Sequence, residues 1–322
     1  MDLIGAGVFG METPVLPDHP FGMVDARHFG LDASTLFQLV RRGVLRHPVP
    51  GVYIPASLPD GLELRCRALR LILPPDAFVC DRSAAWLHAG DRALAPNEHL
   101  EVPPLSCFVP SEGHRLRNKL VVSGEREILP RDLMEVDGLC VTTPLRTALD
   151  LGRLESNADL KLNGMDAMLR LGQFSHEQLL AQVPRFNRRR GVVALRVLAP
   201  LADGGSESFG ESALRLRWIG AGLPRPTTQI SVRDDGREIY RIDMGLEDFR
   251  FGAEYDGEQW HGPERAAYDG ERHRWLEDER NWTLEHFRRR HVFGQQQDAE
   301  VRLRTSYEAL RARLGLPRRF FV

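Results

Sequence analysis

Two periodicities of hydrophobic residues run along this chain. Apolar residues recur every three or four positions in residues 36–40 and 211–224, which predicts amphipathic helices. They alternate with polar residues in residues 44–55, 98–145 and 228–257, which predicts strands. Helices and strands that follow each other in this way predict a multidomain α+β or α/β protein.

The first helix and strand pair predicts a small helix–turn–helix with a wing. Gly43 ends the helical stripe, and the alternating segment that follows turns at a Pro-Gly pair. A winged helix presents a basic helix end to DNA, which makes Arg41 and Arg42 candidate contacts. Small winged helices also dock proteins, so both roles remain open for these two arginines.

Turn residues and composition divide the rest of the chain. A Gly/Ser stretch, DGGSES at residues 203–208, is typical of a flexible linker and marks the clearest boundary. The expected parts are an N-terminal arm and winged helix (1–60), a mixed α/β region (61–155), a helical connector and linker (156–204) and a C-terminal domain (205–322). The C-terminal part is expected to be a mixed sheet flanked by helices.

Composition limits the class of protein. The 322 residues are 42% hydrophobic and 27% charged, without a stretch of about 18 apolar residues that could span a membrane. The first residues lack the basic start and apolar core of a signal peptide. Four cysteines without a CxxC pair fit a reduced, cytoplasmic protein without a zinc ribbon. The net charge of −2 argues against strong non-specific binding to nucleic acid.

A second basic segment precedes an apolar helix in the connector. Arg188 and Arg189 lie within the run RFNRRRG and are candidates for contact with a phosphate backbone. A solvated arginine face is the alternative interpretation.

The candidate chemistry lies near the end of the alternating segment. Asp243 and Glu254, 11 positions apart, fall at the ends of adjacent predicted strands, and an Asp-Gly turn at Asp256 follows. Two carboxylates that converge at such strand ends can share one metal ion. A metal ion that polarises a phosphate and activates water hydrolyses phosphodiesters. The sequence therefore predicts a metal-dependent nuclease site.

Three segments of the first half resemble a known family. They read TLFQLVRRGVLRHPVPGVYIP, CRALRLILPPDAFVCDRSAAWLHAG and VDGLCVTTPLRTALDLGR. Over residues 25–155 they are similar to the winged helix and following region of AbiEi-type antitoxins. This resemblance implies a regulator with nucleic acid, expected to be DNA, as its partner, and a toxin as a further possible partner.

The C-terminal part resembles the PD-(D/E)xK nuclease fold, and within it the Vsr-like endonucleases. The matching residues are Glu211-Ser212, Arg241-Ile242-Asp243, Glu254 to Gly257, Trp260-His261, Asp269, Arg272 and Asn281-Trp282. The resemblance implies Mg²⁺ (or Mn²⁺) held by Asp243, Glu254 and the backbone carbonyl of Tyr255. It also implies that Glu211 holds a second ion or a water and that His261 acts as general acid or base. Trp260 would pack the site or stack on a base.

One position departs from the nuclease pattern. Asp256 stands where the fold usually has a lysine, and where Vsr-like enzymes have a histidine. An anion there cannot neutralise phosphate charge, although it can bind a metal, and Arg272 could supply the missing positive charge. The leading hypothesis is a Mg²⁺-dependent DNA endonuclease with an N-terminal DNA-binding module. The alternatives are a non-catalytic transcriptional regulator or antitoxin with a degenerate nuclease-like domain, and an RNA-directed nuclease.

Overall fold

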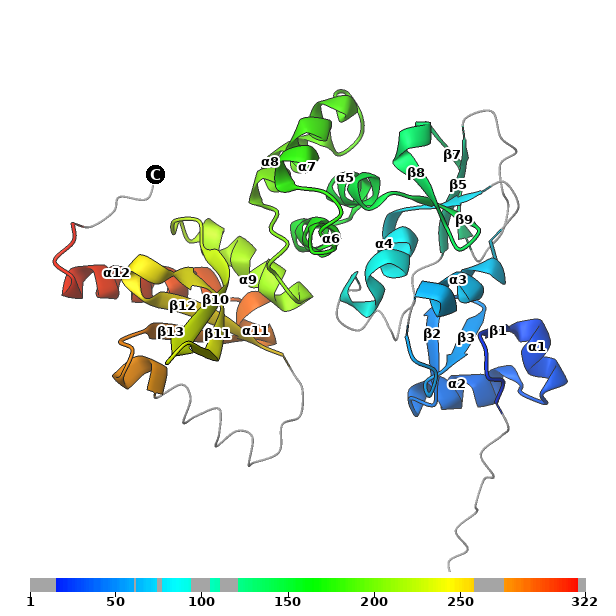
Figure 1. The fold of residues 1–322 in the computed structure, drawn as a ribbon, viewed down its shortest axis with the longest axis horizontal. Coiled ribbons are helices and arrows are strands. Elements are labelled where there is room, and N and C mark those ends of the chain that lie inside the picture. The colour runs from blue at the N-terminus through cyan, green and yellow to red at the C-terminus, as the bar shows by residue number, and fades with distance from the viewer. Residues whose placement is uncertain are drawn as a thin grey trace, which may run out of the picture.

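The computed structural model describes residues 16–60, 62–73, 77–93, 105–110, 121–257 and 275–317. Within them the chain forms three sheets, each associated with helices, as Figure 1 shows. The predicted α+β architecture is confirmed. Among the described residues, no helix has both the length and the apolar character needed to cross a membrane.

The N-terminal unit is a three-stranded sheet packed against two helices. Its elements are β1 (Phe21–Gly22), α1 (Met23–His28), α2 (Ala33–Arg41), β2 (Leu45–Val49) and β3 (Val52–Pro55). Helix α2 begins where the Asp32 side chain accepts a hydrogen bond of 2.7 Å from the Thr35 amide. It ends before Gly43, whose φ of +70° suits glycine. Strands β2 and β3 pair antiparallel, so the predicted hairpin is confirmed.

The middle region begins with a second sheet in the order β6-β5-β4-β9-β8, and β7 pairs with β5. Its elements are α3 (Leu62–Arg70), β4 (Phe78–Val79), α4 (Asp81–Ala89), β5 (Leu105–Pro110), β6 (Val121–Val122), β7 (Glu125–Arg126), β8 (Leu133–Val136) and β9 (Leu139–Thr142). A buried apolar cluster joins this sheet to α3 and α4.

Four helices follow: α5 (Pro144–Leu154), α6 (Ala158–Leu169), α7 (His176–Gln182) and α8 (Val192–Leu198). Short 3-10 turns connect several elements: η1 (Gly90–Ala93), η2 (Pro130–Asp132), η3 (Val183–Phe186), η4 (Ala199–Leu201) and η5 (Glu247–Phe249). The helices share one apolar core, in which Leu162, Met165 and Leu195 are fully buried.

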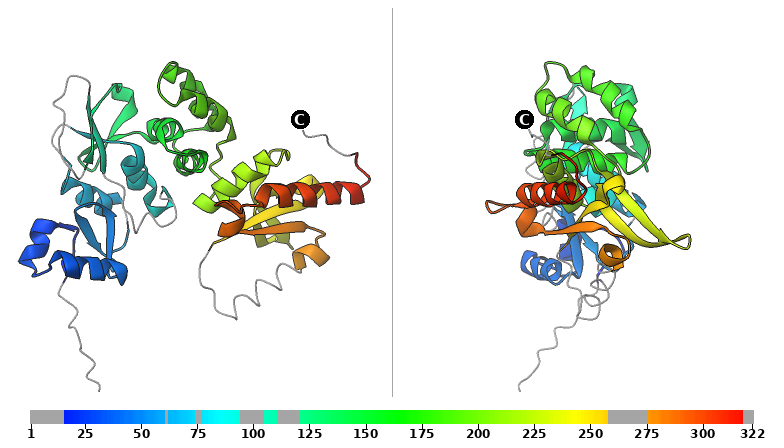
Figure 2. Two further views of the ribbon diagram at one scale, coloured as in Figure 1. Left: turned by 180° about the vertical axis from the view of Figure 1, so that it is seen from behind. Right: turned by 90° about the vertical axis from the view of Figure 1, so that its left-hand side faces the viewer.

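The C-terminal unit is a four-stranded sheet in the order β10-β11-β12-β13. Its elements are α9 (Phe209–Gly220), β10 (Thr227–Asp234), β11 (Arg237–Leu246), β12 (Phe251–Asp256), β13 (Thr283–Arg288), α11 (Arg289–Val292) and α12 (Ala299–Arg313). Helices α9 and α12 pack together against the sheet, as both views in Figure 2 allow the reader to follow. The turn at Asp235 and Gly236 joins β10 and β11, as the Asp-Gly signal predicts.

Two features of this unit differ from the sequence-based expectation. Residues 283–288, which lie outside the strands that the sequence predicts, form β13, and β13 pairs parallel to β12. The expected linker at residues 203–208 is held by hydrogen bonds, including one of 2.8 Å from the Asp203 amide to the buried Asp166 carboxylate. A composition rich in glycine and serine indicates backbone freedom but not the partners that remove it.

Candidate functional site

A cavity of about 490 Å³ opens on the C-terminal sheet. Its lining residues are Glu207, Gln229, Glu238, Ile239, Tyr240, Arg241, Asp243, Glu254, Tyr255 and Asp256. Both carboxylates that the sequence proposes as metal ligands, Asp243 and Glu254, therefore face one cavity. Five acids line it, namely Glu207, Glu238, Asp243, Glu254 and Asp256, whereas Glu211 does not.

Asp243 occupies the point where strands β11 and β12 stop pairing. The antiparallel ladder between them runs from Leu246 opposite Phe251 to Met244 opposite Ala253. At the next step, Asp243 Oδ2 accepts a hydrogen bond of 2.8 Å from the Tyr255 amide. The side chain thus takes the place of a backbone acceptor, which fixes the carboxylate at the edge of the cavity.

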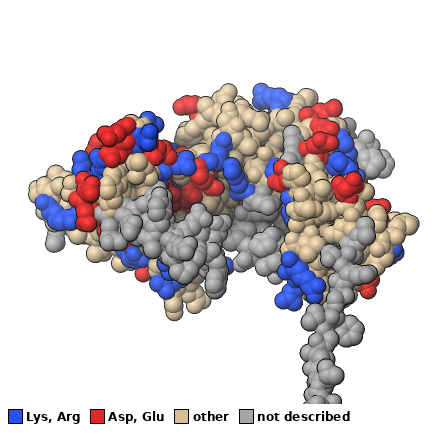
Figure 3. All heavy atoms as spheres, turned by 60° about the horizontal axis from the view of Figure 1, so that its bottom comes forward, with Lys and Arg blue, Asp and Glu red and all other residues tan. Residues whose placement is uncertain are grey.

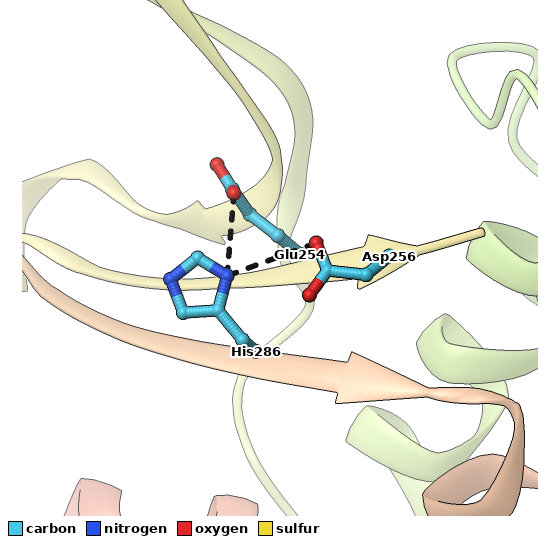
Figure 4. Close-up of side chains that lie close together, drawn as sticks. All are labelled: Glu254, Asp256 and His286. Carbon is cyan, nitrogen blue, oxygen red and sulfur yellow. Dashed lines mark ion pairs between the residues drawn. The ribbon is translucent and has the colours of Figure 1, made fainter. Parts of the chain in front are cut away.

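Glu254, Asp256 and His286 form a compact group, drawn in Figure 4. His286 comes from β13, whose parallel pairing places it opposite Glu254. Its Nδ1 lies 3.6 Å from Glu254 Oε2 and 4.0 Å from Asp256 Oδ1. The Tyr240 hydroxyl donates a hydrogen bond of 2.6 Å to Glu254 Oε2, which orients that buried carboxylate.

The electrostatics of the site favour a bound positive charge. Burial raises the pKa of Asp243 to about 8, and the charge of Glu211 adds to the rise. Burial likewise raises the pKa of Glu211, which accepts hydrogen bonds from the Glu207 amide and the Gln229 side chain. Interaction with Asp256 raises the pKa of His286. The charges of Glu211, Glu254 and Asp256 add to the effect of burial on the pKa of Asp243, and Asp256 raises the pKa of His286, so the site carries negative potential.

The donor atoms suit a small divalent metal ion. Ligands that bind at about 2.1 Å lie at most about 4.2 Å from each other across the ion. The two distances from His286 Nδ1, 3.6 and 4.0 Å, fall within that limit, whereas the 4.8 Å within which all three donors lie is wider than the limit. Carboxylates with one imidazole suit Mn²⁺ among the hard cations, because a nitrogen ligand is less usual for Mg²⁺.

Some of the other residues that the nuclease resemblance names are described by the structure, and some are not. Glu211, on the first turn of α9, does not line the cavity but lies close enough for its charge to act on Asp243. The Tyr255 ring lies beside Gly210 of α9. Four residues of the nuclease resemblance lie outside the described residues: Trp260, His261, Asp269 and Arg272.

His286 is the site residue that the sequence-based interpretation missed. It lies in the segment NWTLEHFRR, 32 positions after Glu254 by number, and no motif links the two. The buried residues of this segment, Leu284 and Phe287, stand three positions apart, so the segment lacks the alternation that predicts a strand. Only the parallel pairing of β12 with β13 brings the imidazole to the acids.

The four predicted nucleic-acid contacts that fall among the described residues, Arg41, Arg42, Arg188 and Arg189, do not line this cavity. Arg41 and Arg42 are exposed at the end of α2, and neither forms an ion pair with any described residue. Arg188 is exposed in the connector, with a left-handed φ of +64°. Arg189 pairs with Glu127, and both side chains are more than half exposed. Basic and acidic side chains are mixed over the face in Figure 3, which fits the near-neutral net charge.

Comparison with known proteins identifies the middle of the chain. Residues 77–201 match the family model of the AbiEi antitoxin C-terminal domain. Two uncharacterized proteins, from two strains of Mycobacterium tuberculosis, are each 33% identical to this chain over 247 residues. These residues make up 76% of this chain and 86% of each mycobacterial protein. The chain belongs to the family of these mycobacterial proteins.

The antitoxin match maps onto the structure from β4 to η4. It confirms the antitoxin-like part of the sequence resemblance, with different limits: residues 156–201 are included and the N-terminal unit is not. The match ends before α9, so the acidic cavity lies outside it. The comparisons carry no support for the nuclease resemblance of residues 205–322.

Proposed function

We propose that this protein is a DNA-binding regulator of the antitoxin type. The observation that carries the proposal is the match of residues 77–201 to the antitoxin domain, attached to an N-terminal unit in which helix α2 has an exposed, basic C-terminal end. The antitoxin domain supports DNA or a toxin as partner. Helix α2 supports DNA as the partner.

Helix α2 carries a polar face suited to the major groove. Ser34, Gln38 and Arg41 are all exposed and follow one another at spacings of four and three residues. Glutamine can bond to adenine and arginine to guanine, while serine contacts either bases or phosphates. The opposite face, with Leu36 and Leu39, is buried in the core. The helix can therefore enter a groove without losing its packing.

The hairpin of β2 and β3 beside α2 is the predicted wing, and its basic side chains stabilise the fold. Arg46 donates a 2.7 Å hydrogen bond to the Leu58 carbonyl, and His47 stacks on Tyr53 at 4.6 Å between ring centroids. Burial lowers the pKa of His47, so its ring stays neutral at physiological pH. These hairpin groups serve the fold, and the exposed Arg41 and Arg42 beside them are available for phosphate or base contacts.

The test is selection from a randomised duplex library, followed by binding measurements on the selected sequence. Arg41→Ala with Arg42→Ala is expected to weaken binding about tenfold or more and to reduce the salt dependence. Arg196→Ala, an exposed arginine on α8 bonded to Asn187, is the matched control and is expected to bind normally. No enriched sequence, or equal affinity in both variants, would contradict the proposal.

A second candidate function is metal-dependent hydrolysis of a phosphodiester. It is favoured by one observation, the group Glu254, Asp256 and His286 beside Asp243 in a single cavity. Those residues would hold the ion, with Mn²⁺ preferred to Mg²⁺ because of the imidazole. When bound, the ion would activate water and stabilise charge on the phosphate. Tyr240 would keep Glu254 in its binding orientation.

Binding and cleavage can be separated in one series. Titration of the chain with Mn²⁺ is expected to show one site that His286→Ala weakens about tenfold or more. A plasmid-nicking assay with Mn²⁺ then compares wild type with Glu254→Gln and Asp243→Asn. Metal binding without nicking would leave a binding site in a non-catalytic regulator, whereas loss of nicking in both variants would establish the enzyme.

A further inference from the structure

A second cavity, of about 460 Å³, lies within the antitoxin-like region. It is walled by residues of β7, η2, α5 and η3. The arginines of its lining are Arg126, Arg131, Arg146, Arg153, Arg185 and Arg189. Among the described residues, the acids that line it are Glu125 and Glu127. No sequence motif for a ligand marks this cavity, because its arginines come from distant segments.

Two buried aspartates, Asp132 and Asp150, form hydrogen bonds with four of the arginines that line the cavity. Asp150, which is fully buried, accepts hydrogen bonds from Arg146 at 2.8 Å, from Arg153 at 2.7 Å and from Arg126 at 3.3 Å. Asp132 accepts from Arg146 at 2.8 Å and from Arg185 at 2.7 Å. These bonds hold the guanidinium groups in place before any ligand arrives.

One aromatic ring gathers three of these cations. The guanidinium carbons of Arg146, Arg153 and Arg185 lie 5.3, 4.4 and 5.8 Å from the centre of the Phe186 ring. The negative face of an aromatic ring attracts cations, so Phe186 offsets part of their mutual repulsion. The arrangement concentrates positive charge around a small volume.

Positive charge remains in excess around the cavity. The acids Asp81, Asp132, Asp150, Glu125 and Glu127 face or support six arginines. Arg131 is exposed and pairs with no acid among the described residues. The Nε of Arg153 is buried and has no hydrogen-bond acceptor in that part of the chain. One additional anion would balance the charge, and the exposed Arg131 guanidinium is available to bind it.

We propose that this arginine cavity binds a phosphate group. The arginines converge from several elements, and the tetrahedral oxygens of a phosphate accept hydrogen bonds from several directions. A planar carboxylate is matched by a single guanidinium fork instead. The volume lies in the range of small-ligand pockets, which leaves room for the group to which the phosphate is attached. This site goes beyond the proposed contact of α2 with DNA.

The phosphate could belong to a free ligand or to a nucleic-acid strand, and the test separates these sources. The full chain is titrated with inorganic pyrophosphate and, separately, with a duplex of about 20 base pairs. Arg131→Gln with Arg189→Gln changes two exposed rim arginines without disturbing the buried aspartates. Arg196→Gln on α8, outside the cavity, is the matched control.

We expect the rim variant to bind pyrophosphate about tenfold more weakly than wild type, with normal affinity in the control. Pyrophosphate binding that depends on the rim supports a free phosphorylated ligand. Duplex binding that depends on the rim, without pyrophosphate binding, assigns the phosphate to nucleic acid. If neither probe binds, or if rim and control variants behave alike, the proposal is wrong. The Arg41 and Arg42 variant changes duplex binding only, so failure of the α2 proposal is distinguishable.

Discussion

The Asp243 carboxyl has a protonation state set by its surroundings. Burial and, after it, the Glu211 charge raise its pKa from 3.8 to about 8, and the hydrogen bond from the Tyr255 amide opposes the rise. Between these two pH values the folded chain holds a proton that the unfolded chain has released. The group therefore makes the free energy of unfolding decrease as pH rises from about 4 to about 8.

Asp243→Asn replaces this carboxyl with a neutral group that can still accept the Tyr255 amide. In buffer with a chelator, the variant is expected to melt roughly 3 °C or more above wild type at pH 9, and to differ little at pH 5. Thermal unfolding followed by circular dichroism measures both. Glu238→Gln, which lines the same cavity with a side chain 45% exposed, serves as the control and should show no such contrast. An equal shift at both pH values would contradict the assigned pKa.

At the scale of elements, the site depends on how closely α9 approaches β12. A Cβ atom added at Gly210 would lie 2.0 Å from the Tyr255 ring, so only glycine allows this approach. Gly210→Ala is expected to lower the free energy of unfolding by about 1–3 kcal/mol through overpacking. Helix propensity acts in the opposite direction, since alanine favours a helix by up to about 1 kcal/mol over glycine.

Gly257→Ala is the matched control for Gly210→Ala. Gly257 directly follows β12, and an added Cβ would meet no atom within 4 Å. Chemical denaturation of both variants measures the difference. A stabilised Gly210→Ala variant would show that the helix and strand can separate without cost, and that the contact does not position Asp243 and Glu211.

The elements that the sequence predicts are those with local signals. Helix α2 has its cap at Asp32 and its stop at Gly43, and β10 and β11 flank an Asp-Gly turn. The cavity combines predictable and unpredictable parts. The sequence predicts that Asp243 and Glu254 come together, because they lie on neighbouring strands. His286 reaches them through the parallel pairing of β12 with β13, although it follows Glu254 by 32 positions. Such a non-local register leaves no trace in the periodicity of either strand.

At the scale of the whole molecule, a buried ion pair joins the antitoxin-like region to the C-terminal unit. Asp166 of α6 and Arg215 of α9 are each about 1% exposed and form an ion pair. Ser212 donates a 2.7 Å hydrogen bond to the same carboxylate, and Arg215 Nε donates to Ser206 at 3.2 Å. A pair separated by 49 positions cannot be recognised from sequence, which explains why residues 203–208 resemble a flexible linker.

Asp166→Asn leaves the Arg215 charge buried without its counter-ion, which is expected to cost on the order of 3 kcal/mol and to loosen the junction. Cleavage after Glu207 by a glutamate-specific protease under native conditions reports this loosening, because Glu207 lies in the junction and pairs with Arg170. Wild type is expected to resist and the variant to be cut. Asp159→Asn removes a pair with Arg217 between the same two helices, at 14–18% exposure, and should cost less than about 1 kcal/mol. Rapid cleavage of wild type, or equal cleavage of the two variants, would show that the two regions are joined by a flexible linker after all.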